Sequence, residues 1–176
     1  MKFFIYLFQI AGAERVMYEY ANKLNGKIYC IFKDQFSLER VKNEYNETIE
    51  IEYGLKNFIL AIFSKGKNLV FLNRAGLIFT IFKIIFGINY HIFIHSMPPK
   101  SYIGKKLMKL VFLNSTKIFF ISNQQKEIYL KMELITRNDY LNKCKVILNP
   151  ISTLSKNLLN HNSKKILSSK IIPKKK

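Results

Sequence analysis

Polar residues that could bind a ligand or take part in catalysis follow the ends of several apolar runs in this chain. His95 and Ser96 come directly after Tyr90–Ile94, and Ser122 follows the run at Lys117–Ile121. An imidazole can donate or accept a hydrogen bond, or act as a base near neutral pH, so His95 can contact a sugar hydroxyl or a phosphate. The alternative is a histidine that ends a strand and satisfies a local carbonyl. Serine at position 122 is more often a helix cap than a ligand.

A glycine turn follows the first apolar run. Gly12 lies between Lys2–Leu7 and the amphipathic segment Ala13–Leu24, an order typical of strand, turn and helix. The free N–H groups and the positive dipole end of such a helix suit an anionic ligand. Because glycine is also the default residue wherever φ is positive, the turn alone identifies no ligand.

The scaffold expected to position these residues is a parallel sheet. Short apolar runs alternate with segments long enough for helices, which predicts a Rossmann-like α/β fold with helices on both faces. The predicted strands are Lys2–Leu7, Lys27–Phe32, Leu69–Leu72, Tyr90–Ile94, Lys117–Ile121 and Lys145–Leu148, with a short additional strand at Thr48–Ile51.

The predicted sheet has one edge where a ligand is expected. In open α/β sheets, ligands bind beyond the carboxyl ends of the strands. The residues following four strands, Gly12, His95, Ser122 and Asn149, can therefore converge on one edge. His91 begins its strand at the opposite edge and is given no role.

The length of 176 residues favours one domain, which we assign to residues 1–151, followed by a basic, loosely ordered tail at 152–176. Cys30 and Cys144 are expected to be buried, reduced thiols of a cytoplasmic protein. Neither has neighbours at metal-ligand spacing, and no cofactor is expected. The apolar segment Leu77–Ile88 is too short to span a membrane and predicts a buried or interfacial helix.

The net charge of +18 has two interpretations. A coding bias toward lysine, asparagine and isoleucine would produce it without function, whereas the functional interpretation is attraction to an anionic surface. A helix carrying Lys100, Lys105, Lys106 and Lys109, with Leu107, Met108, Leu110 and Val111 between them, would suit docking at an anionic leaflet. The alternative is an ordinary amphipathic helix with a solvated lysine face.

Several of these segments carry a family resemblance. Ala11-Gly12-Ala13-Glu14-Arg15-Val16 resembles the Gly-Gly-Ala-Glu-Arg-Val turn of family 4 retaining glycosyltransferases, which have the GT-B fold. Three later segments resemble the family in the same order, and together they cover roughly residues 1 to 151. They are His95-Ser96, Phe120-Ile121-Ser122-Asn123-Gln124-Gln125 and Val146-Ile147-Leu148-Asn149-Pro150-Ile151.

The resemblance implies a transferase that moves a sugar from a nucleotide-sugar donor to a surface glycan, a lipopolysaccharide or a lipid-linked acceptor. This chain would form the N-terminal, acceptor-side half of a GT-B fold. His95 would contact the transferring sugar as the catalytic residue. The substrate-binding residues would be Gly12, Arg15, Ser96, Ser122 and Asn149.

The resemblance also implies a second domain that this sequence does not contain. That domain carries most of the donor site, so the chain is expected to be a truncated enzyme or one subunit of a split enzyme, with little or no transferase activity alone. We expect it in the cytoplasm or at the inner face of the membrane. The competing hypothesis is a basic α/β protein that binds nucleic acid or membrane without transferase activity. Scarce arginine, and aromatic residues that lie mostly inside predicted strands and buried helices, argue against nucleic acid.

Overall fold

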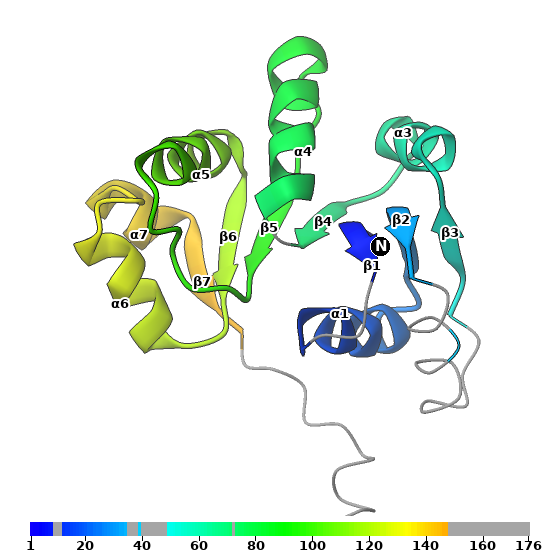
Figure 1. The fold of residues 1–176 in the computed structure, drawn as a ribbon, viewed down its shortest axis with the longest axis horizontal. Coiled ribbons are helices and arrows are strands. Elements are labelled where there is room, and N and C mark those ends of the chain that lie inside the picture. Colours follow the sequence, from blue (N-terminus) through cyan, green and yellow to red (C-terminus); the bar gives the residue numbers. More distant parts are fainter. Residues whose placement is uncertain (9–11, 35–38, 40–48, 72, 148–176) are drawn as a thin grey trace, which may run out of the picture.

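A computed structural model describes residues 1–8, 12–34, 39, 49–71 and 73–147 of the chain. Its strands form one open, all-parallel sheet in the order β3-β2-β1-β4-β5-β6-β7 (Figure 1). The strands are β1 (Lys2–Phe8), β2 (Lys27–Lys33), β3 (Ile51–Tyr53), β4 (Asn68–Phe71), β5 (His91–Ile94), β6 (Lys117–Phe120) and β7 (Cys144–Val146). The described helices are α1 (Gly12–Lys23), α3 (Leu55–Phe63), α4 (Asn73–Phe86), α5 (Tyr102–Asn114), α6 (Asn123–Lys131) and α7 (Arg137–Asn142). The predicted Rossmann-like α/β fold is confirmed.

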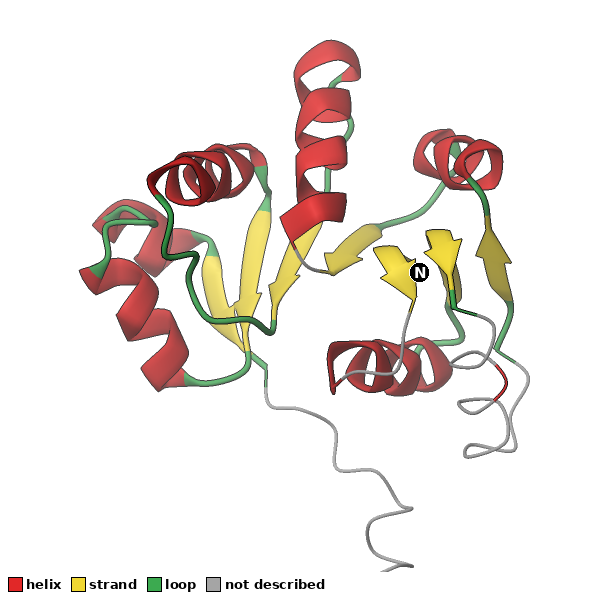
Figure 2. Cartoon of the chain, viewed as in Figure 1, coloured by secondary structure: helices red, strands yellow, loops and turns green. Residues whose placement is uncertain are grey.

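Helices cover both faces of the sheet (Figure 2). Phe3 and Ile5 of β1 point to the face that is packed by α1. Phe4 points to the other face, in the core built with α3, α4, α5 and α6. Because successive residues of a strand alternate between faces, a strand covered on both sides must be apolar throughout. This explains why the sequence of β1 is apolar without interruption from Phe3 to Phe8.

Helix α1 ends where the sequence changes to Asn25-Gly26. Asn25 has a φ of 46°, and Gly26 N–H donates to the carbonyl of Ala21 at 2.7 Å. A Cβ atom on Gly26 would lie 2.3 Å from the Phe3 ring, so only glycine fits at this contact between helix end and strand. The stop of the helix therefore also lets the chain pass close to β1.

Helix α4 differs in its bounds from the expected helix Leu77–Ile88. It begins at Asn73 and ends at Phe86, because Gly87 takes a φ of 71°, which an α-helix does not allow. Among the described residues, no helix is long and apolar enough to cross a membrane.

Other differences arise between β2 and β4 and near the end of the described chain. The expected strand at Thr48–Ile51 is displaced, since β3 covers Ile51–Tyr53, and Thr48 lies outside the described residues. Sequence patterns did not predict α3 or the six-residue helix α7. Helix α7 starts because the side chain of Thr136 caps it, accepting a hydrogen bond from Asp139 N–H. The proposed tail at 152–176 also lies outside the described residues.

Candidate functional site

The parallel register of β5 and β6 brings three predicted site residues to one edge of the sheet. Ile94 pairs with Phe120 at the carboxyl ends of these strands. His95 and Ser96 therefore leave β5 beside the point where Ser122 leaves β6. This juxtaposition follows from strand order, since β5 and β6 are neighbours in the sheet.

Gln125 joins the two chain segments at this edge. Its side-chain Nε2 donates to the carbonyl of Ser96 at 3.0 Å, while its Oε1 accepts from Ile121 N–H at 3.1 Å. Tyr129 Oη donates to the same Ser96 carbonyl at 3.0 Å. Both residues belong to α6, so this helix holds the loop after β5 in place. We infer no ligand contact for Gln125, whose role here is positioning.

Ser122 has the helix-capping role that its position predicts. It is the N-cap of α6, and its Oγ accepts a hydrogen bond from Gln125 N–H at 3.0 Å. Serine followed three residues later by glutamine is the pattern of a capping box, in which the glutamine side chain turns back toward the helix start. Here that side chain reaches Ile121 N–H, one residue before the cap. The pattern could have identified Gln125 from sequence.

His95 lies in an aromatic stack that keeps its imidazole neutral. The ring centroid is 4.7 Å from that of Phe93 and 6.2 Å from that of Phe71, with the planes nearly parallel. Burial disfavours the charged imidazolium and lowers the pKa of His95 to about 4. At neutral pH the ring therefore has one N–H donor and one acceptor nitrogen.

Two polar atoms at this edge lack hydrogen-bond partners among the described residues. They are Nε2 of His95 and Oγ of Ser96, both fully buried. Buried polar atoms are nearly always satisfied, since an unmade hydrogen bond costs about 1–3 kcal/mol. Each atom therefore keeps a hydrogen-bonding capacity that no described residue uses. Because both atoms are buried, a polar ligand can reach them only when the surrounding groups move.

The N-terminus of α1 holds two further predicted residues. Gly12 is exposed, its φ is not left-handed, and a Cβ atom there would meet none of the described residues within 4 Å. Neither the backbone conformation nor the packing of the described residues therefore requires glycine at position 12. Arg15, one turn into the helix, is half-buried. The remaining predicted residue, Asn149, lies outside the described residues, as do positions 9–11 before the helix.

Glu14 in the first turn of α1 is buried rather than exposed. Burial raises the pKa of its carboxyl group, and a hydrogen bond from its own backbone N–H partly opposes this rise. A carboxylate at this place also interacts favourably with the helix dipole.

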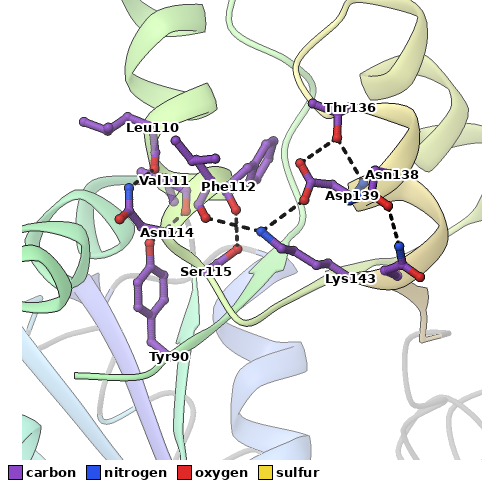
Figure 3. Close-up of polar contacts among 12 residues, drawn as sticks. Tyr90, Leu110, Val111, Phe112, Asn114, Ser115, Thr136, Asn138, Asp139 and Lys143 are labelled. Atoms are coloured by element: carbon purple, nitrogen blue, oxygen red, sulfur yellow. Dashed lines mark hydrogen bonds and ion pairs between the residues drawn. The ribbon is translucent and has the colours of Figure 1, made fainter. Parts of the chain in front are cut away.

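A cavity of about 520 Å³ lies away from these residues, between α5 and the segment from the end of α6 to α7. Figure 3 shows polar contacts that involve four of the lining residues, Leu110, Phe112, Thr136 and Asp139. Lys143 donates to the carbonyl of Leu113 at 3.3 Å and pairs with Asp139 at 3.0 Å, tying α7 to the end of α5. Among the described residues, no predicted site residue lines this cavity.

The helix expected to dock at a leaflet is α5, and its structure corrects part of that expectation. Met108 and Val111 are buried in the core under the sheet-facing side of the helix, so they are not free to contact lipid. Leu107 and Leu110 remain 41% exposed. Tyr102, Ile103 and Leu113 of α5 are also exposed, at 67–71%. Docking through α5 would therefore use a different set of apolar side chains from the one that the sequence suggests.

Both cysteines are buried and free, as predicted. Burial raises the pKa of Cys30 and of Cys144 to about 11, which leaves the thiols protonated at neutral pH. Within the described ranges, no cluster of three or more histidine, cysteine, aspartate or glutamate side chains could hold a metal ion.

Comparison with protein families and with curated proteins finds no match for this chain.

Proposed function

We propose that this chain is the acceptor-side domain of a glycosyltransferase and binds a sugar-containing acceptor at the carboxyl edge of its sheet. The proposal rests on the sequence resemblance, whose segments include the turn before α1, the end of β5 and the start of α6. The observation that carries it is the neutral His95 with its buried Nε2, beside the buried hydroxyl of Ser96.

These two groups are suited to neutral, hydroxyl-rich ligands. A neutral imidazole binds a sugar hydroxyl without the cost of burying a charge. The ring is also fixed by its stacking on Phe93, which lowers the entropy lost on binding. In the reaction, His95 would contact the transferring sugar, while Ser96 would help to orient it.

The α1 N-terminus supplies the anion-binding part of the proposed site. Backbone N–H groups at a helix start favour phosphate, and no described residue lies within 4 Å of a Cβ atom at Gly12, which favours close approach of a ligand. Arg15 on the same helix would add positive charge. Because the resemblance assigns the donor side of the cleft to a second domain, we expect the domain described here to bind weakly and to transfer little or no sugar by itself.

Nuclear magnetic resonance on the full chain tests the proposal. Glucose, inorganic diphosphate and UDP-glucose are added separately, and the imidazole signals and the amide of Gly12 are followed. We expect glucose to shift His95, and diphosphate to shift Gly12, at millimolar concentrations. His91, at the opposite edge, serves as the internal control because its signals should not move.

Two variants separate binding from general perturbation. His95→Phe keeps an aromatic ring in the stack but removes both nitrogens. Glucose should then no longer shift the backbone amide of Ser96, which reports binding when the His95 imidazole is absent. Gly12→Ala adds a methyl group in open space and should weaken the response to diphosphate alone. If no probe shifts His95 or Gly12, the proposal fails. A sugar-transfer rate typical of enzymes would refute the expected dependence on a second domain.

A further inference from the structure

Helix α4 is apolar on its exposed side as well as on its core side. Ala75 and Phe79 are buried in the core, yet Ile81 is 56% exposed, and Ile84 and Ile85 are each 63% exposed. These three isoleucines share one helix face by their spacing. A surface helix of a globular protein normally carries polar residues there. Packing in the core therefore does not explain why the exposed face of α4 is apolar.

Helix α3 extends the apolar surface. The ring of Phe63 lies 5.6 Å from that of Phe82 and 5.3 Å from that of Phe86, so the ends of α3 and α4 are in contact. Figure 1 shows the last turns of α4 projecting beyond α3 and α5. We define the α4 patch as the exposed residues Leu60, Phe63, Ile81, Ile84, Ile85 and Phe86. Contiguous apolar patches of this kind mark interaction sites.

The α4 patch lies in a part of the chain that carries positive charge only. Residues 53–126 contain ten lysines and one arginine, and no aspartate or glutamate. Lys65 and Lys67 follow α3 directly and are exposed. Lys83 lies within α4, where its ammonium group donates to Asn89 Oδ1 at 2.6 Å. An apolar surface among cations fits a partner that offers both hydrocarbon and negative charge.

This charge pattern disfavours other occupants. A second copy of the chain would bring its own lysines against these lysines. The segment 152–176 contains seven lysines and no acidic residue, so it would be repelled as well. Nucleic acid is recognised through arginine and through aromatic faces for base stacking, whereas the α4 patch is mainly aliphatic and Arg74 is the single arginine in residues 53–126.

We infer that the α4 patch docks onto an anionic lipid bilayer. Its isoleucine side chains enter the interfacial region, and the neighbouring lysines reach the headgroup phosphates with their ammonium groups. The patch lies near the amino ends of the strands, since Lys2 at the start of β1 donates to the carbonyls of Ala61 and Ser64 at the end of α3, both at 2.6 Å. It is thus separate from His95, and the inference stands independently of the proposed sugar site.

Vesicle sedimentation of the full chain tests the inference. Vesicles of phosphatidylcholine alone are compared with vesicles that also contain phosphatidylglycerol, at low and high salt. We expect binding to the anionic vesicles only, reduced by salt. The double variant Ile84→Glu with Ile85→Glu should reduce the partition coefficient at least about tenfold, because it removes apolar contact and adds repulsion. Replacing Lys65 and Lys67 by glutamine should reduce it by about fivefold per lysine.

Matched controls keep the result specific to the α4 patch. Leu141→Glu changes an equally exposed apolar residue on α7 and should leave binding unchanged. Lys131→Gln with Lys145→Gln should weaken binding less than the Lys65 and Lys67 pair. Circular dichroism verifies that each variant is folded.

Three outcomes would overturn the inference. The first is binding that ignores phosphatidylglycerol or survives the isoleucine double variant. The second is a dimer in sedimentation velocity that the same variant converts to monomer. The third is tight, salt-sensitive binding of a short RNA together with absence of binding to anionic vesicles.

Discussion

Replacing His95 by phenylalanine should flatten the dependence of stability on acid. The folded protein lowers the pKa of this imidazole from 6.5 to about 4 by burial. Between these values the unfolded chain binds a proton that the folded chain does not, so stability is present above about pH 6.5 and falls as the pH is lowered toward about 4. Each pH unit within this window costs about 1.4 kcal/mol.

The full window corresponds to an upper limit of about 3 kcal/mol, and partial exposure of the ring to water reduces the expected loss to about 2 kcal/mol. His95→Phe keeps an aromatic ring stacked on Phe93, but this ring cannot titrate. Between about pH 6.5 and pH 4 the free energy of unfolding of the variant should therefore fall by about 2 kcal/mol less than that of the wild type. Subtracting the free energies of unfolding of the two proteins at each pH removes the contributions of the other titrating groups. One of these is Glu14, whose pKa is raised by burial.

Urea unfolding followed by circular dichroism at several pH values measures this difference, since the chain contains no tryptophan for fluorescence. His91→Phe is the matched control, because the pKa of His91 is also lowered by burial and by nearby lysines. The effect of His91→Phe on the pH dependence of stability should be additive with that of His95→Phe, so the effect of His95→Phe should also be seen in the double variant. Parallel stability curves for the wild type and His95→Phe, or an imidazole pKa of His95 near 6.5 in the folded protein, would refute the burial argument.

Three further predictions concern packing and thiol chemistry. Tyr90→Phe should cost about 1–2 kcal/mol in urea unfolding, because the buried Tyr90 hydroxyl donates to a carbonyl of α5 at 2.8 Å; an unchanged midpoint would contradict this. Gly76→Ala should lower thermal stability by about 1–3 kcal/mol, since its Cβ atom would lie 2.9 Å from side chains of β5 and α5. Gly12→Ala, in open space, should instead be neutral or stabilising by up to about 1 kcal/mol, and equal losses at both glycines would exclude this packing explanation. Cys30 and Cys144 should react with a thiol reagent only after urea unfolds the protein, and rapid labelling of the folded chain would show that they are not buried.

Local sequence patterns determined most elements of this protein. Continuous apolar runs predicted the strands, because a parallel strand covered on both faces needs apolar residues at every position. Ser122 predicted the start of α6, since its side chain satisfies a backbone N–H that the helix itself leaves free. The glycosyltransferase assignment stays a prediction, because it rests on short segments and on a site whose ligand contacts are untested.

Only the tertiary structure decided which of these segments meet. Strand order places β5 beside β6, and this pairing allows Gln125 to hold the loop that contains His95 and Ser96. Burial of His95 also depends on rings distant in sequence, such as Phe71, so its lowered pKa could not be predicted from its neighbours. For α4, the spacing of apolar residues in the sequence could not predict which side of the helix is buried. A helix that is apolar all round indicates no preferred buried side, and the contacts of the folded chain decide which side chains remain exposed.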